Sequence, residues 1–150
     1  MESGETREYD AQTLKAEGLQ AANDHEEAIT LLMAWLDNRE GAGKLKGVGH
    51  RVVHGGQRYR DAVVLTDDDV KALEALSSLA PLHQPHCLAP VKLLMAHYPH
   101  VPQVASFDTA FHAEQPHVAK QFALPRELTR KGLIRYGFHG LSYDYINRML

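Results

Sequence analysis

The sequence predicts a mixed α/β sheet flanked by helices, because apolar runs of strand length alternate with segments whose apolar residues recur at helical spacing. Hydrophobic residues make up 44% of the 150 residues and charged residues 23%, a balance typical of a globular domain with one core. The excess of Asp and Glu, 19 against 16 Lys and Arg, gives no electrostatic support for binding nucleic acid.

The first predicted element is a helix that begins after Asp24, which can cap its N-terminus with Glu27 three residues on. The apolar residues expected on its buried face are Ile29, Leu32, Met33 and Leu36. Residues 41–43 are rich in glycine and end this helix. Residues 48–53 follow as a strand that stops at the glycine turn of residues 55–56.

A second strand, over residues 62–65, gives way at Thr66 to another helix. The apolar residues that predict the buried face of this helix are Val70, Leu73, Leu76 and Leu79. Three aspartates, residues 67–69, lie in its first turn and could suggest a metal site. Carboxylates at a helix N-terminus are favoured by the helix dipole and are usually solvated, so we expect no metal there.

Pro81 and Pro85 predict an ordered loop, and residues 88–98 are expected to form the next helix. Its buried side is predicted from Val91, Leu94 and Met95. Residues 101–107 then form an apolar strand. Residues 143–150 open a last helix that no glycine, proline or basic turn closes, so we expect the chain to be a piece of a longer protein.

The single cysteine, Cys87, cannot form an internal disulfide, which favours a cytoplasmic location. It has no basic partner in a nucleophile pattern, so we expect a small buried apolar residue. The first ten residues are polar and charged, with no apolar run behind them, and predict neither a secretory signal nor a membrane span.

Four short runs place Arg, His, Asp and Gly at loop positions where anions are usually held. They are residues 49–56 (GHRVVHGG), 79–86 (LAPLHQPH), 105–112 (ASFDTAFH) and 135–142 (RYGFHGLS). In phosphoryl transfer the reacting groups are anions, so catalysis consists mainly of positioning them and neutralising their charge. The composition of these runs is suited to that task.

Three side chains in these runs are candidates for this chemistry, and each keeps a structural alternative. Arg51 could hold a carboxylate or phosphoryl group in bidentate fashion, or form a surface ion pair. His139, beside a helix start, could donate to an anion, or lie buried against a backbone carbonyl. Asp108 follows a strand and could orient Arg51 or place Mg²⁺ through water, or cap the next helix with Thr109 as a rival cap.

His83 and His86 form a His-x-x-His pair that invites a zinc interpretation, with His112 as a conceivable third ligand. A zinc site needs a defined ligand set, and this loop lacks the His-Glu-x-x-His pattern. A zinc-dependent hydrolase is therefore the most distant alternative.

The four runs together resemble the acetate kinase (acetokinase) family. The first, third and fourth are near-verbatim matches to the family's signatures, and the second differs mainly at Gln84, where the family usually has Asn. The resemblance covers residues 48–146. It implies an incomplete ribonuclease H-like (actin-like ATPase) domain over residues 1–110, with a mixed sheet flanked by helices, and the start of a second similar domain over residues 111–150.

The resemblance also implies a reaction, the reversible transfer of the γ-phosphoryl group of ATP to acetate, which gives acetyl phosphate and ADP. Propionate is an alternative substrate. Residues that match Arg51, Asp108 and His139 are catalytic in that family: Arg51 would neutralise the acyl phosphate, His139 would stabilise the planar phosphoryl group, and Asp108 would support the metal and arginine network. The substrate-binding pocket around the methyl group corresponds to Val53, Leu82 and Phe138, with Arg51 at its charged end.

Within the same resemblance, His83 is expected to contact the phosphates together with His139. ATP and Mg²⁺ are the cofactors of the family, but its Asn-x-Gly-Ser-Ser-Ser loop, adenosine-binding turns, second arginine and Mg²⁺-binding glutamate have no match here. We therefore expect a fragment that is inactive alone, from a protein that is a homodimer when complete and binds neither nucleic acid nor membrane. The alternative from another class is a non-catalytic remnant or interaction module of the same fold.

Overall fold

The computed structural model describes residue 22, residues 24–40 and residues 45–150. Two units, Met1–Lys46 and Gly47–Leu150, are distinguished by their internal contacts. In the first unit, α2 covers His25–Glu40. The predicted cap is confirmed, since Asp24 Oδ1 accepts a hydrogen bond from the Glu27 amide at 2.8 Å. The first ten residues and the glycines expected to end this helix lie outside the described residues.

The predicted buried face of α2 is partly wrong. Met33 is buried and Ile29 and Leu36 are half-buried, but Leu32 is 47% exposed. These three more buried residues follow a spacing of four and then three, which is a narrower apolar stripe than the sequence pattern suggested.

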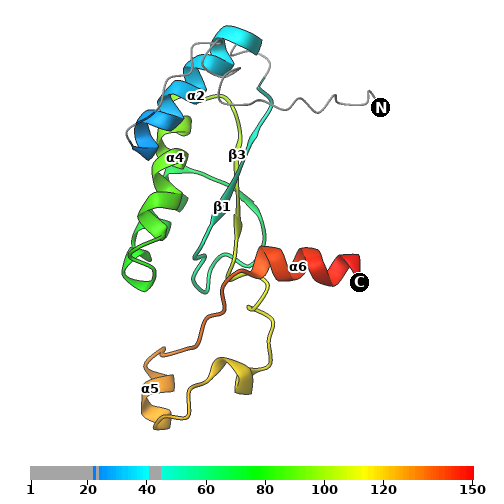
Figure 1. Cartoon of the computed structure of the whole chain (residues 1–150). Helices are drawn as coiled ribbons and strands as arrows, with labels where there is room; N and C mark the ends of the chain where they lie inside the picture. Colours follow the sequence, from blue (N-terminus) through cyan, green and yellow to red (C-terminus); the bar gives the residue numbers. More distant parts are fainter. Residues whose placement is uncertain (1–21, 23, 41–44) are drawn as a thin grey trace. The chain divides into compact units, whose positions relative to one another are not determined.

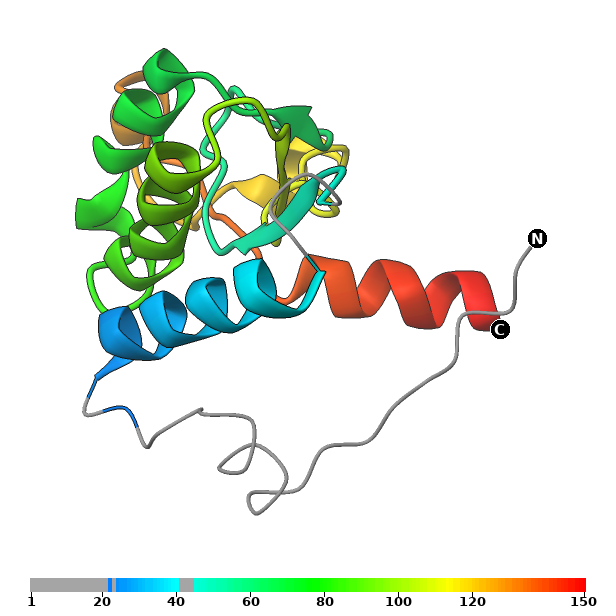
Figure 2. The same ribbon diagram turned by 90° about the horizontal axis from the view of Figure 1, so that it is seen from above.

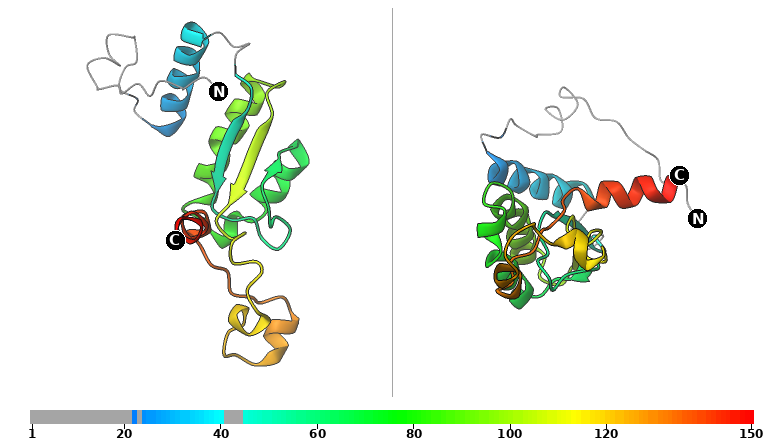
Figure 3. Two further views of the ribbon diagram at one scale, coloured as in Figure 1. Left: turned by 90° about the vertical axis from the view of Figure 1, so that its right-hand side faces the viewer. Right: turned by 90° about the horizontal axis from the view of Figure 1, so that it is seen from below.

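The second unit contains a three-stranded mixed sheet in the order β1-β3-β2, which confirms the predicted class (Figure 1). β1 (Val48–Val52) pairs in parallel with β3 (Gln103–Phe107), and β2 (Val63–Val64) pairs with β3 in antiparallel fashion. The parallel register sets Val52 opposite Phe107, so both strands end at the same edge. Figure 3 shows these two strands side by side.

The helix after β2, α3 (Asp67–Glu74), explains the aspartate run without a metal. Thr66 and Asp69 form a capping box, in which the Thr66 side chain accepts from the Asp69 amide and Asp69 Oδ2 accepts from the Thr66 amide. Asp68 pairs with Lys71 at 3.2 Å. Hydrogen bonds from Thr66 and Tyr59 lower the pKa of Asp69. Carboxylate and helix N-terminus therefore stabilise each other.

Leu79 was expected on the buried face of α3 and is not there. α3 ends at Glu74, and Leu79 lies in the short 3-10 helix η2 (Ser77–Leu79), where it is 49% exposed. Val70 and Leu73 are buried as predicted.

The connection from β2 back to β3 ends in α4 (Gln84–His97), which begins four residues earlier than predicted. Pro85 was expected in the preceding loop but lies in the first turn of the helix, where the missing N–H costs no hydrogen bond. Leu88 and Val91 of α4 are buried. In the described part of the chain, no helix has the combined length and apolarity that a membrane crossing requires.

Residues after β3 loop away from the sheet and return to its edge (Figure 1). This excursion contains two elements that the sequence did not predict, η3 (His117–Lys120) and α5 (Arg126–Arg130). The last helix, α6 (Gly140–Met149), begins three residues earlier than expected. It lies at the end of the strands (Figure 1) and extends outward from there (Figure 2). The domain boundary expected near residue 110 falls inside this second unit and stays a prediction.

The core lies between the sheet and helices α3 and α4. Its buried members are Val52, Tyr59, Leu65, Val70, Leu73, Leu88, Val91, Ala105 and Phe107. The Tyr59 ring stacks on Phe107 with centroids 5.1 Å apart, and its hydroxyl donates to Asp69 at 2.8 Å. Burial, together with this hydrogen bond, raises the pKa of Tyr59 to about 12. The Tyr59 side chain therefore connects the core to the capping box of α3.

We expect Leu73→Ala to lower the free energy of unfolding by about 2–5 kcal/mol, because it removes a fully buried side chain and leaves a cavity. Urea unfolding followed by far-UV circular dichroism measures the loss. Leu124→Ala is the matched control, since Leu124 is largely exposed and should cost less than about 0.5 kcal/mol. Equal losses in the two variants would contradict this assignment of the core.

Candidate functional site

An ion pair joins the end of β1 to the residue that follows β3. Arg51 Nε donates to Asp108 Oδ1 at 3.1 Å, and Arg51 Nη2 donates to Asp108 Oδ2 at 2.8 Å. Asp108 is 1% exposed, whereas the Arg51 side chain is 58% exposed. The hydrogen bond that Arg51 donates to Asp108, together with the negative charge of Asp108, raises the pKa of Arg51. A permanent cation is thus held in a fixed orientation at the edge of the sheet.

Asp108 does not act as a helix cap, which was its structural alternative. Both of its carboxylate oxygens accept from Arg51, and its amide donates to the Val52 carbonyl at 3.1 Å. The rival cap, Thr109, is also engaged elsewhere, because its hydroxyl accepts from the Gly55 amide at 2.9 Å. A Cβ at Gly55 would lie within 3 Å of the Tyr59 carbonyl and of Phe107, so only glycine fits this close approach.

His139 approaches the same arginine from the fourth run. Its Nδ1 lies 3.5 Å from Arg51 Nη2, and its backbone adopts the left-handed conformation with φ 57° and ψ 22°. The side chain is exposed, so the alternative of a buried structural histidine is wrong. Left-handed backbone is uncommon outside glycine, and here it precedes the first residue of α6.

Gly140 connects this turn to the residue after β3 by a backbone hydrogen bond. Its amide donates to the Asp108 carbonyl at 3.1 Å. A Cβ at this position would overlap the Asp108 carbonyl oxygen and the Cβ of Phe111. The third and fourth runs therefore meet at one peptide, and only glycine permits the approach.

These groups line one pocket of about 490 Å³. Every site residue expected from the sequence contributes to its wall: the polar ones are Arg51, His83, Asp108 and His139, and the apolar ones are Val53, Leu82 and Phe138. The pocket also contains four residues that were not expected there: Leu79, Ala80, His86 and Cys87. Three of these residues belong to the second run, and Cys87 directly follows it. Their position in or beside that run was the sequence feature that could have predicted them as pocket residues.

A larger hollow, of about 910 Å³, lies beside the start of β3 and is a weaker candidate. Its charged groups include Lys71, Glu74 and Lys92. Lys92 pairs with Glu74 at 2.8 Å and Lys71 pairs with Asp68, so these charges neutralise one another. The smaller pocket instead gathers one cation, Arg51, and three imidazoles around a single carboxylate.

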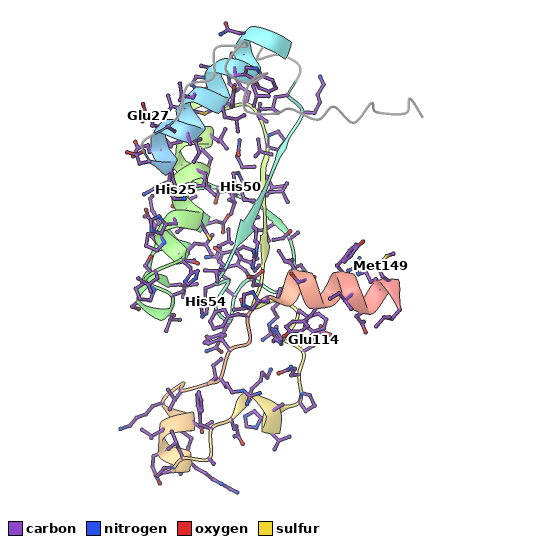
Figure 4. The ribbon with its side chains drawn as sticks, in the orientation of Figure 1. His25, Glu27, His50, His54, Glu114 and Met149 are labelled. Carbon is purple, nitrogen blue, oxygen red and sulfur yellow. The ribbon has the colours of Figure 1, made fainter. Side chains whose placement is uncertain are left out.

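His54 follows the pocket residue Val53 and lies just beyond the end of β1 (Figure 4). It is fully buried, and its Nδ1 accepts from the Gly56 amide at 2.9 Å. Its ring meets Tyr136 and Phe138 edge-on, with centroids 4.4 and 5.8 Å away. Its Nε2 is buried without a hydrogen-bond partner among the described residues. Burial lowers the pKa of His54, so the ring that supports Phe138 is favoured in its neutral form.

The zinc interpretation finds no support in the geometry. His83 and His86 line the pocket, but His112 does not, and its Nε2 lies 3.0 Å from the Phe138 carbonyl oxygen. Across the described ranges of the chain, no three His, Cys, Asp or Glu side chains are grouped so that they could hold a metal ion.

Comparison with known proteins identifies close relatives. The sequence model of the Acetokinase family matches residues 3–150. An acetate kinase of Rhodopseudomonas palustris is 48% identical over 128 residues, which cover 85% of this chain and 32% of that protein. An acetate kinase of Rhizobium meliloti is 48% identical over 130 residues, which cover 87% of this chain and 33% of that protein. The chain thus spans about a third of the length of the curated relatives it matches.

Solved structures share the fold. A propionate kinase from Francisella tularensis superposes with a TM-score of 0.76 at 35% identity, over 84% of this chain and 33% of that one. The acetate kinase from Entamoeba histolytica gives a TM-score of 0.76 at 31% identity, over 85% of this chain and 32% of that one.

We expect His54 to make the protein less stable in acid. Since burial lowers the pKa of His54 in the folded state, the unfolded chain takes up the proton first, and stability falls as the pH drops below about 6.5. In His54→Asn, whose side-chain oxygen can still accept from Gly56, the fall in unfolding free energy between about pH 7.5 and 5.5 should be smaller. Urea titrations at both values measure it, with the exposed His100→Asn as control. An unchanged fall in His54→Asn would refute the assignment.

We expect Gly140→Ala to disturb the site by pushing α6 away from the Asp108 carbonyl, at a cost of about 1–3 kcal/mol. Thermal unfolding measures the cost, and the NMR signals of the His139 ring report the displacement. Gly49→Ala, where the new methyl group meets open space, should leave both unchanged. If both alanine variants resembled the wild type, the close approach at Gly140 would be incorrect.

Proposed function

Because this chain belongs to the Acetokinase family, we propose that its pocket binds the acyl and phosphoryl groups in the reversible transfer of the γ-phosphoryl of ATP to acetate, which yields acetyl phosphate and ADP. The observation that carries the proposal is the convergence of Arg51, Asp108 and His139 on one side of a pocket whose remaining wall is largely apolar. An acyl phosphate has the same division, with a dianionic end and a small hydrocarbon end.

In the proposed reaction, a carboxylate oxygen of acetate forms a bond to the γ-phosphorus as the bond to the ADP oxygen breaks. Arg51 neutralises the charge that the carboxylate and the phosphoryl oxygens bring together. Asp108 acts through Arg51, since its two oxygens fix the plane of the guanidinium. His139, 3.5 Å from that guanidinium, donates to the planar phosphoryl group, and His83, which lines the same pocket, contacts the phosphates.

The apolar wall of Val53, Leu82 and Phe138 receives the methyl group of acetate in this proposal. A pocket of about 490 Å³ has room for a longer acyl chain, and the likeness to a propionate kinase favours propionate as a second substrate. An apolar pocket separates two such substrates by only about 1–3 kcal/mol per methylene, so both belong to one substrate class.

Mg²⁺ does not fit as a directly bound group in this pocket. Asp108 is the one carboxylate among the described residues that line it, and Arg51 engages both of its oxygens. Mg²⁺ requires near-octahedral oxygen ligands. Mg-ATP therefore enters the proposal as a substrate whose nucleotide and metal ligands lie outside this pocket.

The proposal for the whole protein includes a cytoplasmic location and a homodimer. The location rests on the use of one cysteine, which leaves no structural disulfide within the chain to be kept oxidised. The dimer rests on the resemblance to the family alone. A non-catalytic interaction module of the same fold remains the rival from another class, and it requires no affinity for acyl phosphates.

Cys87 provides a direct test, because the only cysteine of the chain lines the pocket and is half-buried, not buried as expected. We expect acetyl phosphate to slow the alkylation of Cys87 by iodoacetamide about fivefold or more, as an occupied pocket excludes the reagent. Arg51→Ala and Arg51→Lys should lose this protection, because neither retains the bidentate cation. Mass spectrometry of the alkylated chain measures the rates.

Arg58→Ala is the matched control, since Arg58 also pairs with a carboxylate, Asp69, but lies away from the pocket. It should be protected like the wild type. Circular dichroism verifies that each variant is folded. If acetyl phosphate fails to slow alkylation of the wild type, or protects Arg51→Ala equally well, the proposed function is wrong and the interaction module is favoured.

A further inference from the structure

The side chain of Gln84 forms hydrogen bonds between two segments that line the pocket, the one after β1 and the one before α4. Gln84 is fully buried in the first turn of α4. Its Oε1 accepts from the His54 amide at 3.1 Å, and its Nε2 donates to the His54 carbonyl at 2.9 Å and to the Leu73 carbonyl at 3.2 Å. The amide thus pairs with the His54 backbone as a neighbouring strand would.

The two ends of this contact lie directly next to pocket residues. His54 follows Val53, a pocket residue just beyond β1, and Gln84 follows Leu82 and His83, which line the pocket from the turn before α4. The amides of His83 and Gln84 both donate to the Ala80 carbonyl, at 3.0 and 2.8 Å. Residues 80–84 therefore form one tight turn, and the Gln84 amide bonds this turn to His54, the residue after Val53.

We propose that Gln84 is a positioning residue that sets the width of the acyl pocket and thereby the preference between two-carbon and three-carbon acyl phosphates. The proposal rests on the proposed function for its ligands. Its basis is that the Gln84 amide directly bridges the segments that carry Val53 and Leu82. A shorter amide at this position should bring the segments that carry Val53 and Leu82 closer together. An apolar side chain of the same length should let them move apart, because it makes no hydrogen bond to His54.

Two variants separate the effect of the length of the Gln84 side chain from the effect of its hydrogen bonds. Gln84→Asn keeps the amide and shortens it by one methylene, and Gln84→Met keeps the length and removes the hydrogen bonds. Gln103→Asn is the control, because Gln103 is also buried and its amide bonds His50 and Val101, but it does not line this pocket. The Gln103→Asn variant shows how a loss of stability alone changes the alkylation rate and the ligand preference.

The first readout is the rate of Cys87 alkylation without ligand. We expect about a threefold slower reaction in Gln84→Asn, whose pocket is narrower, and about a threefold faster one in Gln84→Met. The second is the ratio of the acetyl phosphate and propionyl phosphate concentrations that give half-protection. In Gln84→Asn this ratio should change about threefold in favour of acetyl phosphate. In Gln84→Met it should approach one, so that neither ligand is preferred.

Gln103→Asn should leave rate and ratio within about twofold of wild type, even where it lowers the melting temperature. Wild-type rates and ratio in a folded Gln84 variant would overturn the inference, as would equal weakening of both ligands with an unchanged ratio. If Gln84→Met does not fold, Gln84→Asn decides. If neither ligand protects the wild type, the proposed function fails, and the alkylation rates still decide whether Gln84 sets the pocket width.

Discussion

The parallel pairing of β1 with β3 is the constraint on which the site depends. Parallel strands deliver their carboxyl ends to the same edge of a sheet, and here that edge receives Arg51 from one strand and Asp108 from just beyond the other. A buried carboxylate is costly unless it is paired and hydrogen-bonded, so the guanidinium stabilises Asp108 while Asp108 orients the guanidinium. More than half of the Arg51 side chain nevertheless stays exposed, which leaves the cation accessible at the pocket.

Secondary structure could be predicted from the sequence wherever a local signal decided it. The expected N-terminal cap, Asp24, is present, and a helix begins after Thr66 as predicted, because both signals depend only on residues within one turn. The start of α4 was predicted too late because proline was treated as a loop residue, although the first helical turn tolerates it. Leu32 was misassigned because exposure depends on neighbours that are distant in the sequence, and Leu79 because α3 ends at Glu74.

The site shows the same division between local and tertiary information. All seven site residues that the four runs predicted line the pocket, since functional residues often cluster in short motifs. The role of Gln84 could not be read in this way. The sequence marked it only as the point where the second run departs from the family's usual Asn, and its three hydrogen bonds reach residues 11 and 30 positions away.

The contacts of Asp108 also bear on the domain boundary expected near residue 110. Its side chain binds Arg51, which precedes that point, and its carbonyl accepts from Gly140, which follows it. If the chain does pass from one domain to the next there, the residues on its two sides are joined at the pocket itself. Arg51 and Asp108 would come from one domain, and Phe138 and His139 from the other. The separation of the imidazole from the guanidinium would then depend on the angle between the domains, and a hinge at this point would couple domain movement directly to the geometry around the phosphoryl group.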